Sequence, residues 1–188
     1  HKGDFRLTPN QNLIISNVAE LDKERITGLL RVFRIENSRH ASPLRLHSMA
    51  CVAFPTCGLA MAESERYLPS LIDRIDERLD AHGIGREAIT IRMTGCPNGC
   101  ARPYIAEIGL VGKGPGHYNL YLGAGFVGDR LNRLYRENID EQEIITSLDL
   151  LFARFSAERE DGERFGDFAV RIGAVAQVSA GKDFHDAA

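Results

Sequence analysis

Apolar residues along the chain change from an alternating to a helical spacing, and each change marks a predicted element. The opening DFRLTPNQNLIISNV alternates around a Thr-Pro-Asn turn, which predicts two extended segments, the first beginning at Phe5. Asn17 then stands where a helix N-cap is expected, before a helix predicted over 18–33. One face of this helix carries apolar residues at helical spacing and is expected to be buried: Ile26, Leu29, Leu30 and Phe33.

A second helical pattern follows a polar, basic stretch over 36–48 that is predicted to be a loop. It covers 59–82, and Pro69 indicates a fresh helix start within it. Gly83 is expected to end this helix. Its apolar stripe consists of Leu68, Leu71, Ile72, Ile75 and Leu79.

Strand patterns dominate the middle of the chain. Residues 88–95 read as one strand, and 105–112 and 117–125 read as a hairpin joined by the turn residues 113–116. Asp140 is predicted to cap a helix whose buried face would contain Ile144, Leu148, Leu151, Phe152 and Phe155. A further short strand is expected over 168–172. The predicted class is α+β, with helices packed on a mixed sheet.

Composition excludes several classes of function. A net charge of -3 and a pI near 6.1 give no reason to expect nucleic acid as a partner. No apolar run approaches the roughly 20 residues of a membrane helix, so no membrane contact is expected. With 44% apolar residues the chain can form a core without disulfides, and a reducing, cytoplasmic location is predicted for its four cysteines. The chain has no initiating methionine, and we expect it to be a fragment of a longer protein.

The four cysteines form two pairs, each within a turn. The spacing is C-x5-C from Cys51 to Cys57 and C-x3-C from Cys96 to Cys100, with 38 residues between the pairs. Turns let thiolates converge on one point, and their exposed backbone N–H groups can donate to sulfur. An iron–sulfur cluster is favoured over structural zinc, which commonly uses shorter spacings and histidine, and over inert buried thiols. The spacing alone does not decide among these three.

The histidines do not suggest a further metal site. Four of the six histidines, His40, His47, His82 and His117, have no ligand-like spacing and are expected at loops and helix ends.

Longer segments around the cysteines resemble a known family. SMACVAFPTCGLAMAESERYLPS and MTGCPNGCARP are similar to the sulfite reductase haemoprotein in its C-terminal half. GDFRLTPNQNLII, AEIGLVGKGPGHYNLYLG and ERFGDFAVRIG extend the resemblance over 1–175, which we expect to be the cluster- and sirohaem-binding half, with 176–188 as a tail.

The resemblance implies a mechanism. Cys51, Cys57, Cys96 and Cys100 would bind a [4Fe–4S] cluster, and Cys100 would also be the axial ligand of sirohaem iron. Sulfite would then be reduced to sulfide in six one-electron steps, with the cofactors supplying the chemistry. Because sirohaem carries carboxylates, basic and amide side chains are expected around it: Arg6, Gln11, Asn12 and Asn98, with Arg45 and Arg92 as weaker candidates.

The resemblance also implies partners. The N-terminal half of the same enzyme would supply the residues that bind sulfite, and a NADPH flavoprotein or a ferredoxin would donate electrons. Two alternatives remain open: a sirohaem-dependent nitrite reductase, and a non-catalytic domain with a structural metal. The start of the first pair, Cys51-Val52-Ala53, differs from the C-T-G-type start of nitrite reductases and favours sulfite.

Overall fold

A computed structural model describes residues 3–35 and 41–184 of the chain. The chain divides into two compact units, His1–Ala41 and Ser42–Ala188. Among the described residues, no helix combines the length and the apolar character needed to cross a membrane.

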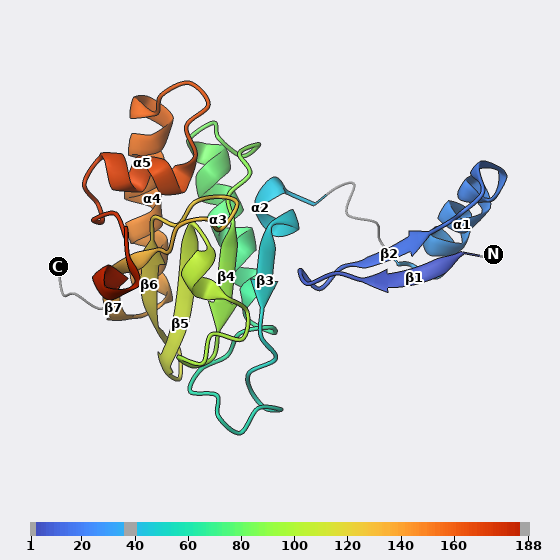
Figure 1. The fold of residues 1–188 in the computed structure, drawn as a ribbon, viewed down its shortest axis with the longest axis horizontal. Coiled ribbons are helices and arrows are strands. Elements are labelled where there is room, and N and C mark those ends of the chain that lie inside the picture. The colour runs from blue at the N-terminus through green and yellow to red at the C-terminus, as the bar shows by residue number, and fades with distance from the viewer. Residues whose placement is uncertain (1–2, 36–40, 185–188) are drawn as a thin grey trace. The chain divides into compact units, whose positions relative to one another are not determined.

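The first unit contains a hairpin and one helix (Figure 1). Strands β1 (Asp4–Leu7) and β2 (Leu13–Ser16) pair antiparallel, with Leu7 opposite Leu13. The turn between them is closed by the Thr8 N–H, which donates to the Asn12 carbonyl at 2.9 Å. Helix α1 (Glu20–Val32) follows. Both predicted strands and the predicted helix are therefore present.

Two details of this helix differ from the prediction. Its N-cap is Ala19, not Asn17, because Asn17 has a left-handed backbone (φ 54°) and its amide donates to Asp4 Oδ2 at 2.7 Å. The predicted face is not buried either: Leu29 is 46% and Phe33 is 70% exposed. Ile26 and Leu30 are half-buried, so the face is only partly covered within this unit. A two-stranded hairpin and one helix offer too few surfaces to enclose a core.

The second unit is built on a five-stranded sheet in the order β3-β4-β5-β6-β7. Strands β3, β4 and β5 are parallel to one another, whereas β6 and β7 each run antiparallel to the preceding strand. The strands are β3 (Ser48–Ala50), β4 (Ile91–Thr94), β5 (Ile108–Gly114), β6 (His117–Leu122) and β7 (Arg133–Ile139).

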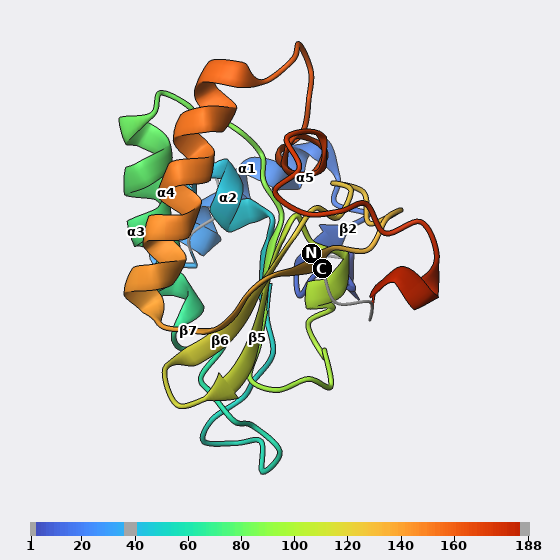
Figure 2. The same cartoon turned by 90° about the vertical axis from the view of Figure 1, so that its left-hand side faces the viewer.

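Helices cover one face of this sheet. Figure 2 shows α3 (Leu68–Ala81) and α4 (Glu141–Glu158) side by side against it. The strands send alternate residues to the two faces, and Ile91 and Met93 of β4 join the core beneath the helices. Arg92 lies between them and therefore belongs to the opposite face. The remaining helical segments are α2 (Pro43–Leu46), α5 (Phe165–Arg171), η2 (Pro103–Ile105) and η3 (Gly181–Phe184).

Several local predictions are confirmed, including the mixed sheet with packed helices. Asp140 accepts from the Glu143 N–H at 2.9 Å, while Glu143 accepts from the Asp140 N–H, which completes a capping box. The turn at 113–116 joins β5 and β6, and Gly83 follows α3 with a positive φ of 71°. The buried stripe of α3 is the one predicted.

Other local predictions are wrong. Residues 168–172 were expected as a strand, but they belong mostly to α5, where Phe165, Phe168 and Ala169 follow the helical spacing of a buried face. Helix α3 begins at Leu68, so the preceding 59–67 are not helical. Part of the predicted loop 36–48 forms α2 and the start of β3, and its first residues, 36–40, lie outside the described part of the chain. Strands β3 and β7 had no clear pattern in the sequence.

Candidate functional site

The two cysteine pairs begin at the same edge of the sheet. Cys51 directly follows β3, and Cys96 comes two residues after the end of β4. These strands are neighbours and parallel, with Ala50 opposite Met93, and the Cys51 N–H continues the pairing by donating to the Met93 carbonyl at 3.1 Å. Because carboxyl ends of parallel strands meet at one edge, residues 45 positions apart in sequence become neighbours.

The loop after β3 packs closely on Gly95. The N–H groups of Met61 and Ala62 both donate to the Gly95 carbonyl, at 2.8 and 3.0 Å. A Cβ atom added to Gly95 would lie 2.6 Å from the Ala62 carbonyl oxygen and 2.7 Å from Ala53 Cβ. The position therefore requires glycine, and the absence of a side chain brings the first cysteine loop against the second.

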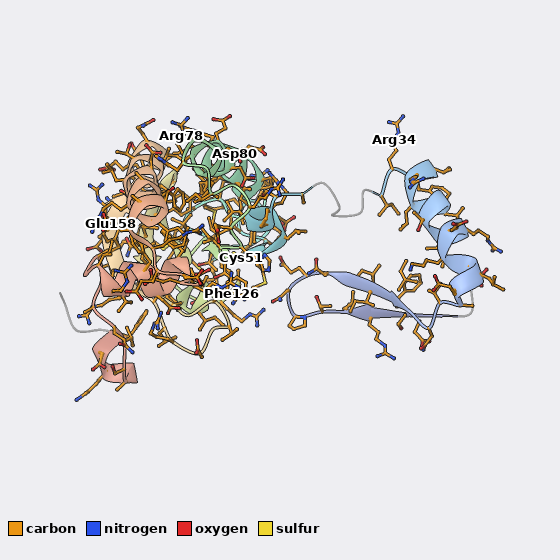
Figure 3. The ribbon with its side chains drawn as sticks, turned by 90° about the horizontal axis from the view of Figure 1, so that it is seen from above. Arg34, Cys51, Arg78, Asp80, Phe126 and Glu158 are labelled. Carbon is orange, nitrogen blue, oxygen red and sulfur yellow. The ribbon has the colours of Figure 1, made fainter. Side chains whose placement is uncertain are left out.

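A backbone hydrogen bond joins the two pairs directly. The Gly95 N–H donates to Cys51 Sγ at 3.3 Å. Such a donor stabilises negative charge on sulfur, and thiolate is the form that binds metal. All four cysteines are free thiols, with Cys96 buried, Cys51 and Cys57 half-buried and Cys100 exposed. In Figure 3 Cys51 lies away from Arg78 and Asp80, which mark the helical side of the unit.

The second cysteine turn is shaped by glycine and braced by an aromatic ring. Gly99 has a positive φ of 69°, and its carbonyl accepts from the Arg102 N–H at 2.7 Å. The Tyr104 hydroxyl donates to the Pro97 carbonyl at 3.2 Å. Burial, followed by the neighbouring Tyr121 and Cys96, raises the pKa of Tyr104, so its phenol stays protonated and remains a donor.

Thiolates of cysteine can ligate either an iron–sulfur cluster or a single metal ion. Within residues 3–35 and 41–184, no three His, Cys, Asp or Glu side chains come together closely enough to hold a single ion. A [4Fe–4S] cluster spreads its four thiolates over four irons, so it demands a wider arrangement.

The side chain of Thr94 is compatible with a polar group bound next to the cysteines. Thr94 is 1% exposed, and its buried hydroxyl has no hydrogen-bond partner among the described residues. A buried hydroxyl without a partner is costly, and this one immediately precedes Gly95 and Cys96. A group rich in sulfur acceptors fits this position, so the residues present are compatible with a cluster.

The other predicted haem contacts are more scattered. Asn98 is exposed within the cysteine turn. The guanidinium of Arg45 pairs with Asp73 at 2.6 Å and donates to the Pro69 carbonyl. Arg92 is half-buried on the face away from α3 and α4, and its pKa is lowered by burial and then by the charge of Arg102.

Three further candidates belong to the first unit. Arg6 lies on β1 opposite Ile14, and Gln11 and Asn12 occupy the turn before β2. Gln11 has a positive φ of 63°, and the Asn12 N–H donates to Thr8 Oγ1 at 3.0 Å. All three are exposed within their unit, and their assignment to the haem stays a prediction.

Sequence reasoning did not identify Gly95, Thr94 or Tyr104 as parts of this site. The role of Gly95 could have been predicted, because a glycine between a strand and a turn often marks a close approach of two backbones. The roles of Thr94 and Tyr104 depend on which strands pair and on the path of the chain after Cys100, and no local pattern encodes these.

Comparison with known proteins places these features in a family. No family model matches the chain. The "Sulfite reductase [NADPH] hemoprotein beta-component" of Staphylococcus epidermidis (strain RP62A) is 60% identical over 185 residues, which cover 98% of this chain and 32% of that protein. The proteins of the same name from Chromohalobacter salexigens and Anoxybacillus flavithermus are 62% and 57% identical.

A solved structure is also similar to this chain. The Mycobacterium tuberculosis NirA protein superposes with a TM-score of 0.74 at 27% identity, over 92% of this chain and 34% of that one. The chain thus spans about a third of the length of the proteins it matches. The resemblance to the sulfite reductase haemoprotein family is confirmed, and the chain corresponds to about one third of such a polypeptide.

Proposed function

We propose that Cys51, Cys57, Cys96 and Cys100 bind a [4Fe–4S] cluster. The observation that carries this proposal is the direct contact of the two cysteine loops at one sheet edge, where the Gly95 N–H donates to Cys51 Sγ. Protein residues hold the ligands in place: Gly95 admits the first loop, and Tyr104 braces the second through Pro97. The relatives' printed name, hemoprotein, supports a haem beside the cluster in the complete protein.

Cys100 is the residue we assign as the ligand shared with sirohaem. It is the exposed cysteine of the four, so its sulfur is accessible to a second group. When bound, the cluster and sirohaem would relay the six electrons, delivered one at a time by an external donor, that reduce sulfite to sulfide. We further assign Asn98 to the haem environment, together with Arg6, Gln11 and Asn12, whose amide and guanidinium groups can donate to carboxylates.

The complete protein, on this proposal, is a NADPH-linked sulfite reductase. The support is the name shared by relatives at 57–62% identity. The rest of the polypeptide would supply the remaining walls of the site and the groups that bind sulfite. A flavoprotein partner would pass electrons from NADPH, and four free thiols suit a reducing cytoplasm.

An iron and acid-labile sulfide assay with a visible spectrum tests this on the intact protein. Five irons to four sulfides with haem bands are expected; zinc without visible bands would end the proposal. Cys100→Ser should alter both the cluster and the haem spectrum, whereas Cys57→Ser should act first on the cluster. Comparing turnover of sulfite with that of nitrite separates the two reductase activities.

A further inference from the structure

Three aromatic rings from distant parts of the second unit meet beside the second cysteine turn. Tyr104 lies in η2, Tyr121 on β6 and Phe184 at the end of η3. Tyr104 meets the other two rings edge-on, with centroids 5.3 Å from that of Tyr121 and 5.2 Å from that of Phe184. Phe184 stacks nearly parallel to Tyr121 at 6.0 Å. These are favoured aromatic geometries, so each ring helps to hold the other two.

Tyr104 contacts the cysteine turn at two points. Its hydroxyl donates to the Pro97 carbonyl at 3.2 Å. A Cβ atom added to Gly99 would lie 3.1 Å from Tyr104 Cε2, so the ring packs directly against this glycine. Both contacted residues lie between Cys96 and Cys100. A shift of the Tyr104 ring therefore acts on the backbone that sets the separation of the two thiols.

The two partners of Tyr104 are held in different ways. Tyr121 is fixed inside the sheet, where it stands opposite Gly109 of β5 and Leu134 of β7. Phe184 belongs to no strand and is carried by a 3-10 helix of four residues. Because 3-10 hydrogen bonds are poorly aligned, such a short helix needs further support to hold a side chain in place.

The C-terminal segment supplies that support next to Phe184. Val178 is buried and anchors the segment on the second unit. The Asp183 carboxylate accepts from the Ser179 N–H at 3.0 Å and from the Ala180 N–H at 2.7 Å. The Asp183 N–H in turn donates to the Ala180 carbonyl at 2.9 Å. One side chain thus closes the turn immediately before Phe184 and directs the chain toward the two tyrosines.

We propose that Phe184 is a positioning residue for the second cysteine turn. It acts through Tyr104, as the ring that the C-terminal segment adds to the aromatic cluster. This rests on the proposed function only in treating Cys96 and Cys100 as cluster ligands. Without the Phe184 ring, Tyr104 keeps a single aromatic neighbour, and the turn that it braces opens more often.

Hydrogen–deuterium exchange of the intact protein, followed by mass spectrometry, tests this role. Phe184→Ala should speed exchange over 97–104 roughly tenfold, because two ring contacts are lost, and leave β5 and β6 at wild-type rates. Asp183→Ala should act in the same direction, because it releases the turn that carries the ring. Phe184→Tyr keeps a ring and should keep the wild-type rate. Lys182→Ala, which removes an exposed side chain of the same turn, is the matched control and should change nothing.

Two results of this experiment would overturn the proposal. One is wild-type exchange over 97–104 in Phe184→Ala. The other is an equal rise throughout the second unit, because the ring would then stabilise the whole fold and not the turn.

Iron loss from the intact protein to EDTA separates positioning of the ligands from packing alone. Phe184→Ala should lose cluster iron several times faster than Lys182→Ala does. Equal rates in these two variants would overturn the positioning role even if exchange over 97–104 had risen. Wild-type protein without iron and sulfide would refute the proposed function, and the exchange rates alone would then decide whether Phe184 holds the turn.

Discussion

Replacing Glu107 by alanine should cost the second unit much of its stability. Glu107 precedes β5 and is fully buried. Its Oε2 accepts from the Thr90 N–H at 2.8 Å and from the Thr90 hydroxyl at 3.3 Å, and its Oε1 accepts from the Gly166 N–H at 3.0 Å. One carboxylate therefore joins the residue before β4 to the start of α5.

The size of the effect follows from what alanine leaves behind. Two buried backbone N–H groups lose their acceptor, and each costs about 1–3 kcal/mol. The removed methylene and carboxyl atoms also leave a cavity, so we expect a loss of about 4 kcal/mol, a large share of the ~5–15 kcal/mol typical of a domain. Glu107→Gln should lose less, because one carbonyl oxygen can still accept from one of the two donors.

Urea unfolding followed by circular dichroism measures this loss. The control is Glu158→Ala, which removes an exposed carboxylate that pairs with Arg154 on the surface and should change little. A loss below about 1 kcal/mol for Glu107→Ala, with an unchanged slope, would refute the reasoning, because it would mean that water or a shifted backbone satisfies both N–H groups.

Three further predictions concern Glu107 and the two residues that precede Cys96. Burial raises the pKa of Glu107, so the folded protein keeps this proton to a higher pH than the unfolded chain does. Wild-type stability should therefore fall relative to that of Glu107→Gln as pH rises from the ordinary carboxyl range through the raised pKa. Urea midpoints of the two proteins that stay parallel across this pH range would contradict the prediction. Gly95→Ala should lower the cluster content of the purified protein, because its Cβ would meet the Ala62 carbonyl at 2.6 Å, and unchanged iron and sulfide would exclude a close fit there. If the buried hydroxyl of Thr94 donates one hydrogen bond to sulfur, Thr94→Val should lower the cluster reduction potential by on the order of 40 mV. Thr94→Ser keeps a hydroxyl and should leave the potential unchanged. A redox titration followed by electron paramagnetic resonance measures both potentials, and equal potentials in the two variants would contradict the hydrogen bond.

Elements with strong local signals could be predicted from the sequence. Asp140 and Glu143 specify their helix start through neighbouring side chains, and the turn at 113–116 joins two alternating segments. Short strands and strands at the edge of the sheet could not be predicted from the sequence. Strand β3 has only three residues, and its existence depends on pairing with β4, which is distant in the sequence.

The same division holds for the candidate site. The cysteine pairs were visible because their spacing is local, whereas the Gly95 N–H bond to Cys51 exists only after β3 and β4 align in parallel. The apolar face of α1 was also a correct pattern, but sequence periodicity reports which side is apolar and not what covers it.

The parallel neighbours β3 and β4 also constrain the order of events during biosynthesis. Parallel strands need a crossover, and here α3 lies between the two cysteine pairs. A chain emerging from the ribosome exposes Cys51 and Cys57 well before Cys96 and Cys100 have been made. On the proposed function, the four thiols could reach one cluster only once the crossover has folded and β4 lies beside β3. Iron–sulfur delivery would then act on a nearly finished fold, because a nascent chain offers only half of the proposed ligand set.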